Sequence, residues 1–167
     1  LAPYLPRDCI LLIEQRIRTA SISGHEGRSY LQARLAPSLA RLGEVSRALE
    51  YARAVDEKWR AMAYLGIAAG TNGEMHRRAI LDALTTVLDL REVWRREQLD
   101  GVVQAIVEDQ ASAEAAWAIA LEWAHAHSRH DAIEVLASFA PVAHSIGGTS
   151  LPDEVFEAIE RVLRWWP

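Results

Sequence analysis

Residues 35–44 read Leu-Ala-Pro-Ser-Leu-Ala-Arg-Leu-Gly-Glu, and the start of this stretch returns along the chain. Leu1-Ala2-Pro3 and Phe139-Ala140-Pro141 repeat its apolar residue, its alanine and its proline. The same register places one large apolar residue in every repeat, which we call the Leu column: Leu1, Leu35, Ile67, Val102 and Phe139. Self-similarity with a period of 32 to 37 residues predicts an array of repeated structural units.

A second group of apolar residues precedes the Leu column in each repeat. Its members lie at i, i+4 and i+7, which is the spacing of one helix face, as in Ile80, Leu84 and Val87. We expect this face to be buried, with Leu84 and Leu121 in equivalent core positions. The middle residue of each triplet lies 18 residues before the Leu-column residue that follows it, as from Leu49 to Ile67 and from Leu84 to Val102. A rigid helical hairpin followed by a variable loop explains this, since surface loops tolerate insertions. The equivalent triplets are Ile13, Ile17 and Ala20; Val45, Leu49 and Ala52; and Trp117, Leu121 and Ala124.

Glycines and polar residues between these groups predict where the helices end, as Gly43 does by favouring a left-handed helix cap. We expect helices over 7–22, 27–41, 44–56, 58–70, 74–90, 92–108, 111–127, 129–144 and 152–165. We expect no strand, because no segment alternates apolar and polar residues. The sequence therefore predicts an all-α fold, a right-handed α-solenoid of about four helical hairpins forming one domain over 1–167. A generic Ala- and Leu-rich helical bundle is the alternative.

The composition indicates a folded protein in a reducing compartment, which we expect to be the cytoplasm. The 167 residues are half hydrophobic, and the net charge of −5 argues against binding to a nucleic-acid backbone. No apolar run approaches the length of a membrane span, so we expect no membrane partner. The single cysteine, Cys9, excludes an internal disulfide. It opens the apolar run of residues 10–13, which predicts a buried thiol.

The packing residues resemble known helical repeats. Leu35-Ala36, Leu39, Gly43 and Ala48-Leu49 resemble the tetratricopeptide pattern, although its large aromatic positions are mostly Ala or Leu here. The Leu-Ala-Pro motif and the pairs Trp59-Arg60 and Trp94-Arg95 look more like the Ala-rich degenerate repeats of large bacterial proteins, such as the sensor regions of STAND-class NTPases. The resemblance implies a recognition scaffold whose partners include other domains of the same chain, and it carries over no catalytic residue. Since both ends match partial repeats, we expect a fragment of a longer array.

A cluster of histidines offers one alternative, a metal-dependent hydrolase. His125, His127, His130 and Asp131 lie close together in the sequence, and these residue types are common zinc ligands. Two residues apart on a helix, the side chains of His125 and His127 diverge by about 200°. His127 also falls in the repeat position of Val55 and Leu90, which predicts a buried or half-buried structural histidine. Since no nucleophile elbow or phosphate-binding loop occurs either, we predict no enzyme, no metal and no cofactor.

The repeats also predict a binding surface for a protein or peptide. In a tetratricopeptide-like solenoid the first helix of each hairpin lines a concave groove, and here that is the helix of the Leu column. The polar candidates for partner binding near that line are Arg41, Asn72, Asp100, Gln104, Glu108 and His144. Such a groove is lined by small residues and is mildly acidic, which favours a basic or apolar peptide.

Overall fold

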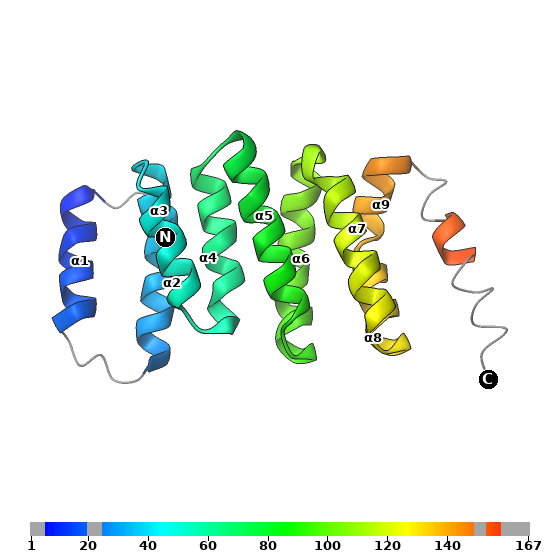
Figure 1. Cartoon of the computed structure of the whole chain (residues 1–167), viewed down its shortest axis with the longest axis horizontal. Helices are drawn as coiled ribbons and strands as arrows, with labels where there is room; N and C mark the ends of the chain where they lie inside the picture. Colours follow the sequence, from blue (N-terminus) through cyan, green and yellow to red (C-terminus); the bar gives the residue numbers. More distant parts are fainter. Residues whose placement is uncertain (1–5, 20–24, 149–152, 158–167) are drawn as a thin grey trace. The chain divides into compact units, whose positions relative to one another are not determined.

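A computed structural model describes residues 6–19, 25–148 and 153–157 of the chain. All regular secondary structure in these ranges is helical, which confirms the all-α prediction (Figure 1). Residues 153–157 are helical as well. The labelled helices are α1 (Arg7–Thr19), α2 (His25–Arg41), α3 (Val45–Ala54), α4 (Glu57–Gly70), α5 (Gly73–Leu88), α6 (Glu92–Glu108), α7 (Gln110–Ala126), α8 (Arg129–Ser138) and α9 (Ala140–Gly147).

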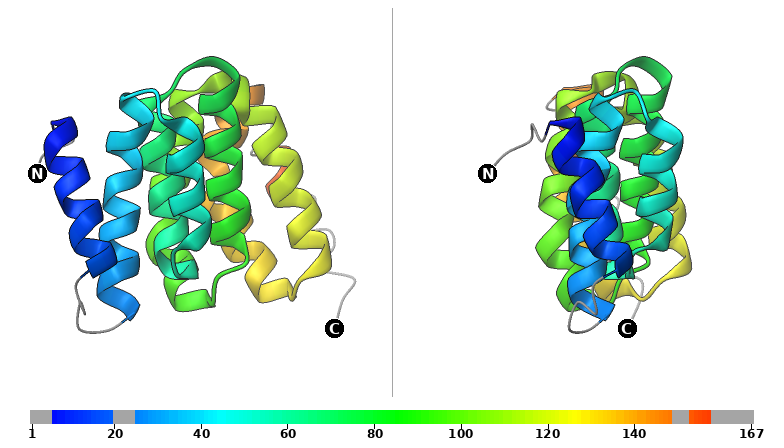
Figure 2. Two further views of the ribbon diagram at one scale, coloured as in Figure 1. Left: turned by 60° about the vertical axis from the view of Figure 1, so that its left-hand side comes forward. Right: turned by 90° about the vertical axis from the view of Figure 1, so that its left-hand side faces the viewer.

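The chain divides into two compact units, Leu1–Gln98 and Leu99–Pro167. In the first unit α2 packs against α3, α4 packs against α5, and α2 also packs directly on α4. Successive helices from α2 to α5 run antiparallel, because the turns between them are short (Figures 1 and 2). In the second unit α7 packs against both α8 and α9. The expected single domain over 1–167 stays a prediction.

The Leu column is buried wherever the structure describes it. Leu35, Ile67, Val102 and Phe139 are each at most 2% exposed, while Leu1 lies outside the described residues. Full burial of side chains of this size stabilises the fold by about 1.5–3 kcal/mol each. The sequence repeat therefore marks core positions in both units.

The second group of apolar positions behaves differently from one helix to the next. In α5 its members Ile80, Leu84 and Val87 are fully buried, whereas Leu121 of α7 is 43% exposed and Ala20 lies outside the described residues. The interpretation of Leu121 as a core residue is therefore wrong. The buried side chains of α7 are instead Ser112, Ala113, Ala116, Ala120 and Trp123. This face is offset by one residue, and thus by about 100°, from the triplet of Trp117, Leu121 and Ala124.

The helix ends show where the predicted boundaries hold and where they fail. Gly43 adopts a φ of +79°, and its amide and that of Glu44 donate to the carbonyls of Ala40 and Leu39, as in a Schellman cap. The expected helix over 129–144 is wrong, because a turn at Phe139 separates α8 from α9. Pro141 explains this interruption, since it has no amide hydrogen and fits the first turn of α9, whereas inside one continuous helix it would remove a hydrogen bond.

Pro37, by contrast, lies within the continuous helix α2. Its ring fills the space above Gly66 of α4, where an added Cβ would lie only 2.2 Å from the Pro37 Cγ. A Cβ on Gly70, one turn later, would approach the Ala40 Cβ to 3.0 Å. The α2–α4 packing therefore depends on two glycines that let the backbones come close.

Helix α1 packs through one narrow face, formed by Ile10, Glu14 and Ile17. Cys9 lies off this face and is exposed, so the prediction of a buried thiol is wrong. The run of apolar residues could not all face inward on a helix, and Leu11 and Leu12 are exposed as well.

Helix α1 packs on α2, and the buried carboxylate of Glu14 links it to side chains of α3. Arg47 Nη2 donates to both Glu14 oxygens, at 2.6 and 2.7 Å, and the Tyr51 hydroxyl donates to Oε1 at 2.8 Å. Arg47 also pairs with Glu44. Burial lowers the pKa of Arg47, but the hydrogen bonds and charges of Glu44 and Glu14 outweigh this and raise it above its ordinary value.

Candidate functional site

The two Trp-Arg pairs occupy equivalent places at the starts of α4 and α6. Arg60 Nη2 donates to the carbonyl oxygen of Val55 at 3.2 Å, and Arg95 Nη1 donates to that of Leu90 at 3.3 Å. Each arginine thus binds the residue five positions before it, in the turn that precedes its helix. The carbonyls of a helix end lack partners within the helix, and these arginines satisfy one in each turn.

The two tryptophans have different surroundings. Trp59 makes an edge-on contact with Tyr30 of α2, with ring centroids 5.0 Å apart, and the Lys58 ammonium lies 5.2 Å from its ring. Trp94 is 37% exposed, with the Arg91 guanidinium 5.9 Å from its ring. Of the two tryptophans, Trp94 is therefore the one whose side chain is more available to a ligand.

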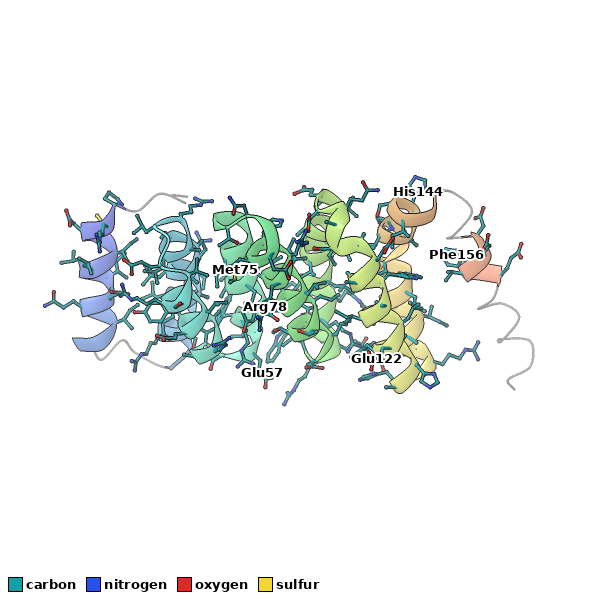
Figure 3. All side chains as sticks on the ribbon, turned by 45° about the horizontal axis from the view of Figure 1, so that its top comes forward. Glu57, Met75, Arg78, Glu122, His144 and Phe156 are labelled. Atoms are coloured by element: carbon teal, nitrogen blue, oxygen red, sulfur yellow. The ribbon has the colours of Figure 1, made fainter. Side chains whose placement is uncertain are left out.

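The exposed face of Trp94 borders a hollow of about 640 Å³ in the first unit. The turn between α3 and α4 forms the rest of its wall, and Figure 3 labels Glu57 at this end of α4. The hollow is broad enough for a few side chains of a peptide. We call it the Trp94 hollow, and it is lined by Arg53, Ala54, Val55, Asp56, Glu57, Lys58, Arg60 and Trp94.

A smaller hollow of about 160 Å³ adjoins the first and shares Glu57 and Arg60 with it. Its remaining wall comes from the end of α5 and the turn after it, through Thr85, Thr86, Asp89 and Leu90. The side chain of Arg60 thus borders both hollows, and its Nε is buried without a hydrogen-bond partner among the described residues. An arginine with unused donors beside an open hollow can bind an anionic or carbonyl group.

The residues predicted to bind a partner are all exposed. In the first unit Arg41 ends α2 and Asn72 precedes α5 as its N-cap. In the second unit Asp100, Gln104 and Glu108 follow one face of α6 at intervals of four residues, and Gln104 Nε2 donates to Glu108 Oε1 at 2.8 Å. His144 lies on α9, where Figure 3 labels it. Their gathering into one groove stays a prediction.

The histidine cluster is spread over the end of α7 and the start of α8. His127 is exposed, so its predicted burial is wrong, but it has structural contacts: it stacks on Trp123 at 3.7 Å and donates from Nδ1 to the Trp123 carbonyl oxygen at 2.7 Å. Asp131 accepts a hydrogen bond from the Ser128 hydroxyl at 2.5 Å at the start of α8. Among the residues that the structure describes, His125, His127, His130 and Asp131 do not bring three ligand atoms within 4.8 Å of one another.

Sequence reasoning noted the Trp-Arg pairs as repeat markers but did not propose the Trp94 hollow. The signal was the recurrence of a tryptophan at the start of a helix, directly after a turn rich in charged residues. The hollow itself depends on residues of α3, α4 and α6 coming together, which no local pattern encodes.

Within the described ranges, the chain has no helix that is both long enough and apolar enough to cross a bilayer. Comparisons of the chain with protein-family models, curated proteins and solved structures find no match.

Proposed function

We propose that this chain is a non-catalytic scaffold that binds protein or peptide partners. The observation that carries the proposal is the Trp94 hollow, an open concavity that joins an exposed tryptophan to two arginines, Arg53 and Arg60. Tryptophan and arginine dominate the residues that contribute most to protein interfaces. A hollow of this size suits a short peptide segment better than it suits a flat protein surface alone.

The proposal extends to the architecture, a right-handed α-solenoid of about four hairpins that acts as the sensor or docking segment of a larger bacterial protein. The pairing of α2 with α3 and of α4 with α5, with α2 directly on α4, supports it, because stacked helical hairpins pack in this way. The equivalent hydrogen bonds of Arg60 and Arg95, 35 residues apart, support it further. The sensor role is supported by the sequence resemblance to STAND-type repeats.

Selection from a random library of displayed 12-residue peptides tests the binding function. We expect the purified protein to enrich related peptides, with dissociation constants in the micromolar range by fluorescence anisotropy, as is common for transient peptide recognition. Failure to enrich any peptide, in a selection that succeeds with a known peptide-binding protein run in parallel, would contradict the proposal.

Metal analysis tests the rival hydrolase function. Protein purified without a metal-affinity column should contain less than stoichiometric zinc and manganese. Stoichiometric metal that disappears in the His130→Ala variant, together with hydrolysis of a model phosphoester, would favour the enzyme instead.

A further inference from the structure

We infer that the Trp94 hollow binds a peptide segment that carries one carboxylate next to an apolar side chain. This inference rests on the proposed scaffold function and names the chemistry of its partner. It differs from the basic or apolar peptide expected for the predicted groove, because the two sites have different residues.

The charges of the wall favour a single negative group. Arg53, Lys58 and Arg60 contribute three positive charges and Asp56 and Glu57 two negative ones, so the lining carries a net charge of 3 − 2 = +1. A carboxylate neutralises that excess, and the planar guanidinium groups match its two oxygens. A phosphate dianion or a nucleic-acid strand would bring further negative charge against Asp56 and Glu57, which disfavours both.

The donors for this carboxylate come from two arginines. Within the described part of the chain, the exposed Arg53 side chain has no hydrogen bond or ion pair, so its five N–H donors are available to a ligand. Arg60 donates from Nη2 to the Val55 carbonyl oxygen, and this hydrogen bond anchors its guanidinium at the wall of the hollow. Because both arginines line the hollow, one carboxylate bound there can accept hydrogen bonds from Arg53 and from Arg60.

The apolar part of the segment belongs against Trp94. Trp94 is 37% exposed and lines the hollow together with Ala54 and Val55. An aliphatic or aromatic side chain of the segment would therefore cover apolar surface there. Aromatic contacts of this kind add to the gain from buried area. The hollow thus places an apolar contact and a carboxylate contact side by side.

Two small probes test this chemistry directly: N-acetylphenylalanine, which has a free carboxylate, and its neutral amide. Both are titrated into the full chain labelled with nitrogen-15 while backbone and indole resonances are followed. We expect the acid to shift the amides of residues 53–60 and the Trp94 indole, and to bind about tenfold more tightly than the amide. Equal affinity of the two probes, or shifts confined to other residues, would overturn the inference.

Matched variants locate the two contacts. Arg53→Gln keeps the side-chain length and should weaken binding of the acid about three- to tenfold while leaving the amide unaffected. Trp94→Leu should weaken both probes by similar factors. Arg78→Gln, on the exposed side of α5 and outside the hollow, is the control and should change neither (Figure 3). Because Arg53 is exposed and has no partner in the described part of the chain, its variant should fold, and an unchanged affinity for the acid would overturn the carboxylate contact.

Peptides from the library selection separate this inference from the scaffold function. Peptides that bind the Arg53→Gln and Trp94→Leu proteins as tightly as the parent would preserve the scaffold function and overturn the assignment of the hollow. Shifts at the hollow with the acid probe, in a protein that selects no peptide, would support its chemistry and contradict the scaffold function.

Discussion

Helices α5 and α7 carry equivalent apolar triplets in the sequence, yet only α5 buries its triplet in full. In α5 Leu84 lies in the core, and in α7 the equivalent Leu121 is 43% exposed while Trp123 is buried. Both helices bury two alanines, each one position before a triplet member: Ala79 and Ala83 in α5, and Ala116 and Ala120 in α7. The buried face of α5 extends from these alanines across the triplet, whereas that of α7 extends the other way, to Ala113 and Trp123. A repeat pattern therefore identifies the helices but does not by itself orient them.

The largest expected effect separates these two leucines. Leu84→Ala should lower the free energy of unfolding by about 2–5 kcal/mol, because it removes a fully buried side chain and leaves a cavity. Leu121→Ala should cost less than about 1 kcal/mol, since Leu121 is already 43% exposed and its truncation leaves no enclosed cavity. Urea denaturation of both variants measures the two changes in the free energy of unfolding. Equal decreases would mean that Leu121 is buried, as the triplet predicts.

The next largest effect concerns the ion pair between Arg47 and the buried Glu14 in the first unit. Arg47→Met removes the two hydrogen bonds that Arg47 donates to the buried carboxylate of Glu14, and it should cost about 2–3 kcal/mol. This is below the 3–5 kcal/mol typical of a fully buried pair because the Arg47 side chain is 40% exposed. Arg77→Met is the control, since the Arg77–Glu74 pair is exposed on both sides and should contribute less than about 1 kcal/mol. A cost for Arg47→Met no larger than the control would show that α1 does not depend on this pair.

A third variant probes the close packing of α2 on α4. Gly66→Ala should destabilise the protein by about 1–3 kcal/mol, because the new Cβ would overlap the Pro37 ring. The double variant Pro37→Ala with Gly66→Ala removes the ring and should recover most of that loss. Thermal melting of the single and double variants forms a double-mutant cycle, and simple additivity of the two changes would rule out the contact.

The smallest effect compares helix starts in the two units. Ser128→Ala should cost about 1 kcal/mol, because the Ser128 hydroxyl accepts a hydrogen bond from the Asp131 amide at the start of α8. Asn72→Ala should cost only a few tenths of a kcal/mol, since Asn72 caps α5 without a side-chain hydrogen bond. Chemical denaturation that ranks the two variants in the reverse order would contradict the assignment of these caps.

The helical class and most helix boundaries were predictable from the sequence, because they depend on local periodicity and turn residues. The Leu column marks the core correctly at Leu35, Ile67, Val102 and Phe139. The break at Phe139 was missed, although Pro141 is a signal for it. The same motif contains Pro37, which lies within a continuous helix, so the motif alone does not predict a break. A proline restricts the backbone in both places, and only the surrounding packing decides whether the helix continues.

The candidate site was less predictable. The exposure of Arg41, Asp100 and the other predicted groove residues agrees with a binding role, but exposure is common to most charged residues. The Trp94 hollow joins residues from three helices that are up to 41 positions apart, from Arg53 to Trp94. Buried Glu14 was missed for the same reason, because its partners Arg47 and Tyr51 come from α3, 33 and 37 residues further along the chain.

The contact between Pro37 and Gly66 also restricts the order in which the sequence can change during evolution. A nucleotide change that converts the glycine codon into that of any other amino acid adds a Cβ, which would meet the proline ring. Replacing Pro37 first creates no such overlap and restores an amide hydrogen to α2. We therefore expect mutational paths through this pair to run in one direction, with position 37 losing its ring before position 66 gains a side chain.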